Sequence, residues 1–510
     1  MLHYLLEWDS GTFTGIESWQ DITEDASAID WTIGHTTGDL SDRTAAPGTL
    51  SFFVDNSATN SFATLAKYSP PTYWDVGYRV RLRMQHGGSY YGVPLYGAAT
   101  YGGDAFCFIG RIKSITPTAG TLSDRKVKVE VGDFMDALST KKVERLAIAE
   151  SIKSEAAAAA IIANLIVAPE ATDYGTGQET FLYFGDDMRD ERTTALAALD
   201  KIAKSEFGYV YTKPDGTFTF EDRHARRDYT GWVRTFTDED WVSLDVTRNI
   251  EDVINRAEVA TNPRSIGGSP ETLWSLQKAV AIPASGTVVI TGRYTDPNQQ
   301  IARVSGMDME PMVAGTHYDF ASGETGSDLT ANITVTPDWG ANAVEFTIVN
   351  NVATPGYVTM LKAIGTAIRM FDPVINTAAD SDSQDDYDLR LWQYDMPYQT
   401  RTLTGQAIAD AVLAAFKAPF YYIRGMSWVP DTASDLADAF VIAVGDGIKI
   451  TSALHGITDK EVYVNGVHGR ILNQNTVVFD YVLAYAFTGV AWMLGVAGKS
   501  EIGVTTWLGF

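Results

Sequence analysis

The sequence predicts a mainly β protein with α+β parts, divided into several domains. Its 510 residues exceed what one hydrophobic core usually organises, and chains of this length divide into domains. Short runs of alternating or β-branched residues recur between Gly, Pro, Asn and Asp, which is typical of strands joined by turns. The 44 glycines and the aromatic fraction of 11% fit this fold class, because turns favour glycine and strands favour aromatic residues.

Residues 1–138 predict a small β-barrel or β-sandwich. Its strand-like runs are IDWTIG, GTLSFFVDN, YRVRLRMQ, DAFCFIGRIKSI and RKVKVEVGDF. A Tyr- and Gly-rich stretch, residues 89–103, interrupts them and predicts a projecting loop that contacts a ligand or a partner through its aromatic faces. The alternative is a loop packed against the protein itself. The four tyrosines are Tyr90, Tyr91, Tyr96 and Tyr101.

Residues 139–238 predict an α+β domain of helices and one hairpin. The run ERLAIAESIKSEAAAAAIIANLIVA is rich in Ala, Glu and Lys and predicts one or two helices. DERTTALAALDKIAKSEF predicts a further helix. In FGYVYTKPDGTFTFEDR two strand-like runs flank Pro214-Asp215-Gly216, which predicts a hairpin.

Residues 239–376 predict a second β-rich domain. The runs are VINRAEVATN, GTVVITGRYT, NITVTPDWGANAVEFTIVNN and YVTMLKAIGTAIRM, and Gly340-Ala341-Asn342 predicts a hairpin turn.

Residues 377–510 predict a helix followed by further β-strands. An acidic loop, DSDSQDDYD, comes first, and the helix TLTGQAIADAVLAAFKAP ends before Pro419. The strand-like runs are FYYIRGMSWV, DGIKITSAL, KEVYVNGVHGRIL and NTVVFDYVLAY. Residues 481–498 carry no charge and just reach the length of a membrane span. Glycines interrupt them, so buried strands are predicted and a membrane span is the alternative.

Charge and cysteine content restrict the protein's setting. With 39 basic and 64 acidic residues the net charge is −25, which repels phosphate and argues against stable nucleic-acid binding. A passage through which DNA slides stays compatible with that charge. One cysteine allows no intrachain disulfide, and MLHYLLEWDSG lacks the pattern of a signal peptide, so synthesis in a reducing cytoplasm without signal-dependent export is expected.

No catalytic, cofactor-binding or metal-binding motif is found, so no enzymatic activity is expected. The histidines are scattered without metal-ligand spacing: His3, His35, His86, His224, His317, His455 and His468. The acidic loop from Asp380 to Asp388 fails the EF-hand pattern, because Asp385 and Leu391 stand where Gly and Glu are needed. A solvated turn is predicted there, with a different kind of calcium site as the alternative. Cys107 lies in a strand-like run and is expected in the core.

Short motifs of a few residues each follow one another in a fixed order along the first part of the chain. They are Trp8-Asp9 with Gly11, Trp19-Gln20-Asp21-Ile22-Thr23, Asp30-Trp31 with Gly34, Ala46-Pro47-Gly48-Thr49-Leu50, Asn56, Asp75-Val76-Gly77, Arg79-Val80-Arg81, Phe108-Ile109-Gly110-Arg111-Ile112 and Val131-Gly132-Asp133. In order and spacing they resemble the N-terminal region of the tail hub, or baseplate hub, proteins of long-tailed bacteriophages. Later stretches are similar to the same family: residues 203–223, residues 380–387, the helix at 403–416 and residues 445–450.

The resemblance implies a fold and a role. It implies two similar barrels per subunit, a helix-and-hairpin domain and a further β/α domain. It also implies a homotrimer at the distal end of the tail tube, which joins a sixfold tube to a threefold tip and closes or lines the DNA channel for genome delivery. The implied partners are the distal tail protein, the tape measure protein and tail fibre or tip proteins, with membrane contact only at ejection and the virion tail tip as the location.

Two other functions compete with this one. The Tyr/Gly stretch and the 12 tryptophans favour a receptor- or carbohydrate-binding tail-tip protein. The 64 acidic residues admit a cell-wall glycoside hydrolase, but they single out no carboxylate pair.

Overall fold

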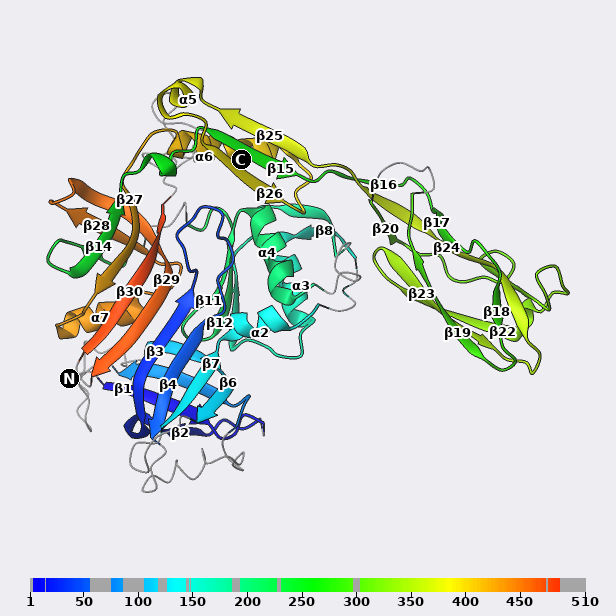
Figure 1. Ribbon diagram of the computed structural model, residues 1–510, viewed down its shortest axis with the longest axis horizontal. Helices are drawn as coiled ribbons and strands as arrows, with labels where there is room; N and C mark the ends of the chain where they lie inside the picture. The colour runs from blue at the N-terminus through cyan, green and yellow to red at the C-terminus, as the bar shows by residue number, and fades with distance from the viewer. Residues whose placement is uncertain are drawn as a thin grey trace.

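The computed structural model describes residues 3–13, 15–55, 75–85, 105–117, 126–143, 146, 148–185, 193–226, 231–296, 303–473 and 476–486. Over these residues the protein is mainly β with several separate sheets, which confirms the predicted fold class. Figure 1 shows a body in which two adjoining β-units lie beside a helical unit, while an elongated β domain projects to one side.

The N-terminal barrel is built from seven strands. They are β1 (His3–Asp9), β2 (Trp19–Asp21), β3 (Ala26–Gly34), β4 (Thr49–Asp55), β5 (Arg79–Gln85), β6 (Ala105–Pro117) and β7 (Lys126–Gly132). Strict alternation in β5 explains its two faces, because Val80, Leu82 and Met84 are fully buried while the arginines between them lie on the outer side. Cys107 of β6 is buried in this core, as expected.

The C-terminal barrel combines strands from two distant stretches of the chain. The first stretch supplies β13 (Thr235–Phe236) and β14 (Trp241–Thr247). The second supplies β27 (Tyr422–Trp428), α7 (Ala433–Val441), β28 (Gly447–Ser452), β29 (Ile457–Asn473) and β30 (Thr476–Tyr485). β13 pairs with β28 and β14 with β27, so strands from the predicted stretches 139–238 and 239–376 join those of 377–510 in one sheet.

The helix-and-hairpin domain packs against both barrels. Its elements are α2 (Phe134–Thr140), β8 (Ala149–Lys153), α3 (Ser154–Ala163), β9 (Ala171–Tyr174), β10 (Thr180–Phe184), α4 (Ala195–Glu206), β11 (Tyr209–Thr212) and β12 (Thr217–Glu221). The hairpin at Pro214-Asp215-Gly216 is confirmed by the antiparallel pairing of β11 with β12. A helix over residues 149–153 is wrong, because that run pairs with β10 as a strand and this tertiary pairing overrides its helical composition. The buried residues of this domain and of the two barrels form one continuous core.

A small β/α unit lies over the body. It contains β15 (Arg256–Thr261), β25 (Val374–Ala379), α5 (Ser381–Tyr387), β26 (Leu391–Met396) and α6 (Thr402–Phe416). The predicted helix before Pro419 is confirmed by α6. The predicted acidic turn is wrong, because residues 381–387 form a helix: Asp380 Oδ1 caps it by accepting the Ser383 N–H at 2.9 Å, and Asp380 Oδ2 pairs with Lys417 at 2.9 Å.

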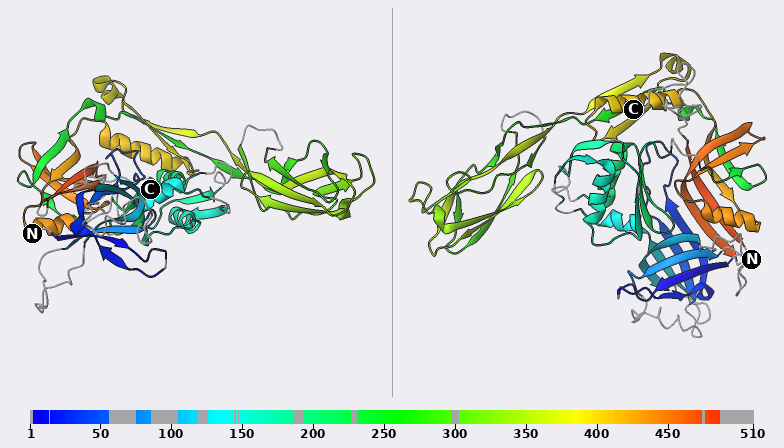
Figure 2. Two further views of the ribbon diagram at one scale, coloured as in Figure 1. Left: turned by 60° about the horizontal axis from the view of Figure 1, so that its bottom comes forward. Right: turned by 180° about the vertical axis from the view of Figure 1, so that it is seen from behind.

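The projecting β domain inserts between β15 and β25. Its strands are β16 (Arg264–Ile266), β17 (Glu271–Ser275), β18 (Val280–Ile282), β19 (Thr287–Arg293), β20 (Arg303–Met307), β21 (Tyr318–Ala321), β22 (Ile333–Trp339), β23 (Ala343–Asn350) and β24 (Gly356–Met370). β22 and β23 form the predicted hairpin around Gly340-Ala341-Asn342. The domain has its own core, and Figure 2 shows from two further directions that it extends away from the body.

Candidate functional site

The two barrels join edge to edge along β3 and β29. The antiparallel pairing runs from Gly34↔Gly466 to Asp30↔Arg470, so that one thirteen-stranded sheet passes through both barrels. We call this the barrel seam. Trp31 is 1% exposed beneath it, and a Cβ on Gly469 would lie 2.0 Å from Trp31 Cζ2. The seam therefore needs a residue without a side chain at position 469.

Polar side chains line the strands beside the barrel seam, and the contact between His468 of β29 and Asp30 of β3 crosses it. His468 Nε2 lies 2.8 Å from Asp30 Oδ2, and Arg470 Nη2 lies 2.8 Å from Asp480 Oδ2. His468 Nδ1 also lies 3.5 Å from the Asp480 carboxylate. These side chains are a third or more exposed, so they fix the register of the strands more than they add stability.

A buried polar junction fixes the helix-and-hairpin domain to both barrels. The Arg226 guanidinium is buried, pairs with Glu221 at 2.8 Å, donates to Asn465 Oδ1 at 2.5 Å and lies 3.5 Å from the centre of the Tyr209 ring. The backbone carbonyl of Asn465 accepts the His35 N–H at 2.8 Å, which ties β29 to the end of β3. Burial lowers the pKa of the His35 imidazole, so this histidine is neutral near pH 7.

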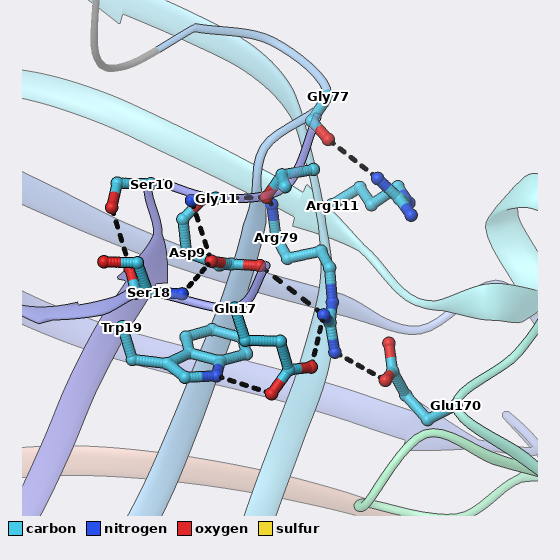
Figure 3. A network of polar contacts seen from close by, with 11 residues as sticks. Asp9, Ser10, Gly11, Glu17, Ser18, Trp19, Gly77, Arg79, Arg111 and Glu170 are labelled. Carbon is cyan, nitrogen blue, oxygen red and sulfur yellow. Dashed lines mark hydrogen bonds and ion pairs between the residues drawn. The ribbon is translucent and has the colours of Figure 1, made fainter. Parts of the chain in front are cut away.

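A second network, drawn in Figure 3, links the N-terminal barrel to the helix-and-hairpin domain through Arg79 of β5. One Arg79 nitrogen lies 2.7 Å from Glu17 and 3.5 Å from Asp9, and the other lies 2.5 Å from Glu170. Hydrogen bonding to Arg79 lowers the pKa of Glu17. Asp9 Oδ1 also accepts two backbone N–H groups, those of Gly11 at 2.9 Å and Ser18 at 2.7 Å. The network thus closes the loop between β1 and β2 and fixes it to the next domain.

Gly77 and Arg111 contact each other beside this network. The φ of +91° at Gly77 is a left-handed conformation that favours glycine, and the Gly77 carbonyl accepts from Arg111 Nη1 at 3.1 Å. Burial, together with the nearby Arg79, lowers the pKa of Arg111.

These arrangements hold the domains in position relative to one another. Burial raises the pKa of the Cys107 thiol, which keeps it protonated and unreactive. Among the described residues no group of His, Cys, Asp or Glu is placed to hold a metal ion. Within the same residues no helix has the length and apolar character needed to cross a membrane.

The predicted ligand loop is not part of these networks. Tyr90, Tyr91, Tyr96 and Tyr101 lie outside the described residues, so their role stays a prediction. Of the apolar stretch 481–498, residues 481–485 belong to β30, with Tyr481 and Leu483 buried, and residues from 487 onward lie outside the described part of the chain.

Several residues of the Arg79 network belong to the short sequence motifs described above, whereas the sequence did not identify the other residues of the candidate site. Asp9, Gly11 and Trp19 form one group in the sequence and Gly77 and Arg79 a second, distant group, and the fold brings the two groups together. The glycines of β29 carried a usable signal, because glycine inside a β-branched strand marks a close approach of another chain segment. Arg226, Asn465 and Glu170 carried none, because their contacts depend on how the domains pack.

Comparison with known proteins finds similarity in fold only. No family model and no curated protein matches the sequence. The 43 kDa tail protein of prophage MuSo2 from Shewanella oneidensis is 7% identical, with a TM-score of 0.47 over 94% of this chain and 98% of that one. A tail protein from Neisseria meningitidis is 9% identical, with a TM-score of 0.47 over 95% of this chain and 96% of that one.

A third similar structure is the E. coli c3393 protein, described as a component of the type VI secretion system with structural similarity to bacteriophage T4 tail proteins. It is 8% identical, with a TM-score of 0.34 over 94% of this chain and 76% of that one.

Proposed function

We propose that this chain is a structural hub at the distal end of a phage tail tube. In this proposal three copies form a ring of six barrels, which joins the sixfold tube to a threefold tip and closes or lines the channel for DNA. The partners are a second and a third copy, the distal tail protein, the tape measure protein and tail fibre or tip proteins. The location is the tail tip of the virion.

The barrel seam is the observation that carries the proposal. Two barrels from opposite ends of the chain share one sheet, and Trp31 and Gly469 fix their approach. A subunit that presents two barrels side by side in a rigid pair supplies two of six positions, so three subunits suffice for a sixfold ring. A ring of this kind also covers free sheet edges, which isolated β proteins have to protect by other means.

Charge and the two polar networks agree with a scaffold through which DNA passes. The net charge of −25 disfavours stable contact with phosphate, so DNA would slide without being held. The Arg79 and Arg226 networks keep both barrels in fixed positions relative to the domain between them. A scaffold needs this rigidity.

The test is the mass of the purified chain by light scattering, alone and with the distal tail protein. A hub gives three times the chain mass of 55.6 kDa, either alone or after the partner is added. Electron microscopy of the same sample is expected to show a ring of six barrels. A monomer under both conditions, with the chain absent from purified tails, would refute the proposal.

A further inference from the structure

Among the described residues of the projecting β domain, β19 is the one strand whose free edge carries no protection. β19 pairs with β23 over seven consecutive residues without a register shift, and it pairs with no second strand in the described part of the chain. Its sequence, TVVITGR, contains no proline and no charge before Arg293. A long regular edge of this kind offers free backbone N–H and C=O groups to another strand.

The other edges of this domain carry the usual protections. β22, at the opposite edge of the same sheet, contains Pro337 and Asp338. In the facing sheet β16, β17, β18, β20 and β21 have three to five residues each, and the pairings of β17 and β21 contain register shifts. Short strands, bulges and prolines all prevent unwanted strand pairing. β19 has none of them.

The side chains of β19 indicate which chemistry would pair there. Val289 is 55% exposed on the outer face of the sheet, between two exposed threonines. Arg293 is exposed and has no ion-pair partner among the described residues. Arg369 of the same domain, by contrast, pairs with both Glu271 and Asp296. An unpaired arginine at the end of a free edge favours a carboxylate on the incoming segment.

We propose that an extended segment of another polypeptide adds to the sheet alongside β19 and places a carboxylate near Arg293. Backbone hydrogen bonds provide the affinity, and Val289 and Arg293 select the segment. A second copy of this chain is a poorer occupant, because pairing β19 with itself requires a twofold axis, which a threefold hub lacks. The inference rests on the proposed function in naming a neighbouring tail protein as the source of the segment and in using threefold symmetry to disfavour a second copy.

Hydrogen–deuterium exchange of the full-length chain, free and within purified tails, tests this. Peptides covering residues 287–293 are expected to exchange at least ~10-fold more slowly in tails. Peptides covering the proline-containing edge at residues 333–339 are expected to be unchanged. Unchanged exchange at 287–293 in tails that contain the chain overturns this inference alone, whereas absence of the chain from tails overturns the proposed function as well.

Two charge reversals within the same domain separate the edge from general effects. Arg293→Glu is expected to lose most of the protection at 287–293 in tails, while Lys278→Glu, at another exposed position, behaves as the unaltered chain does. Both variants should unfold at the same temperature as the unaltered chain. Equal protection in both variants contradicts the carboxylate contact. If residues 287–293 are already protected from exchange in the purified chain and its mass is doubled, a second copy occupies the edge. That result would overturn the proposal.

Discussion

Arg79 and Glu170 form an ion pair of 2.5 Å between the N-terminal barrel and the helix-and-hairpin domain. The two residues are 91 positions apart in sequence. Arg79 also contacts Asp9 and Glu17, so a single guanidinium joins a strand, a loop and the next domain. Its side chain is 14% exposed, and charge-assisted hydrogen bonds at this depth are stronger than those at the surface.

We predict that Arg79→Ala lowers the free energy of unfolding by about 2 kcal/mol. The loss arises because Asp9, which is 1% exposed, keeps its backbone contacts but loses its cationic partner. Denaturant unfolding monitored by tryptophan fluorescence measures the change. Lys213→Ala is the control, because the side chains of the Lys213–Asp173 pair are 34% and 54% exposed and the pair should contribute less than about 1 kcal/mol. Equal effects of the two substitutions would argue against the Arg79 network as a link between domains.

The barrel seam gives a second prediction, at Gly469. Gly469→Ala is expected to destabilise the protein by about 2–3 kcal/mol, because the added Cβ would meet the buried Trp31 ring at 2.0 Å. Gly268→Ala is the matched control, since nothing lies within 4 Å of a Cβ at that position. In a double-mutant cycle, Trp31→Phe should recover part of the loss caused by Gly469→Ala, because the smaller ring makes room. Strictly additive effects would show that the clash is relieved in another way.

The seam also shows where local sequence patterns stop being informative. The two hairpins and the helices α4 and α6 followed from turn residues and helical spacing, because these signals lie within a few residues of one another. The pairing of β3 with β29, and of β14 with β27, joins segments from far apart in the chain. Alternation predicts that each of these runs is a strand, but it does not say which strand is its neighbour.

Two incorrect predictions have the same origin. Residues 149–153 form a strand because β10 lies beside them, and residues 381–387 form a helix because Asp380 caps it and Lys417 holds the cap. Amino-acid composition favoured a helix for residues 149–153 and a turn for residues 381–387. For the candidate site, the motif resemblance covered Asp9, Gly77 and Arg79, but the partner across the domain boundary, Glu170, became visible only in the fold.

Asp133 gives a prediction about pH. Its buried carboxylate caps α2 and accepts the N–H groups of Gly48 and Asp136 through Oδ1, while Oδ2 has no hydrogen-bond partner. Burial raises the pKa of Asp133 to about 7. The folded state therefore binds more protons than the unfolded state between the ordinary pKa of an aspartate and about pH 7. Stability that is present at low pH is lost as the pH rises through about 7.

Asp133→Asn is expected to remove this dependence. The asparagine Oδ1 can still accept both N–H groups, and no charge has to be buried above pH 7. We expect the free energy of unfolding of the unaltered chain, relative to the variant, to fall by on the order of 2 kcal/mol between pH 5 and pH 8. Thermal unfolding of both proteins at several pH values measures it. A difference that stays constant with pH, or that grows in the opposite direction, would refute the assignment.

The projecting β domain is expected to be separable from the body. Its core is distinct from the other two, and the chain enters and leaves it through Arg264 and Met370, which are antiparallel partners. Replacing residues 265–369 with Asn-Gly therefore joins two adjacent strand ends by a short turn. The shortened chain should keep the unfolding temperature of the body within about 5 °C and lose one calorimetric transition, because separate cores unfold separately. Deleting the hairpin at residues 209–221, which contributes to the main core, is the contrasting control and should prevent folding. If the shortened chain aggregates or melts far below the full chain, the domain stabilises the body through contacts beyond the two connecting strands.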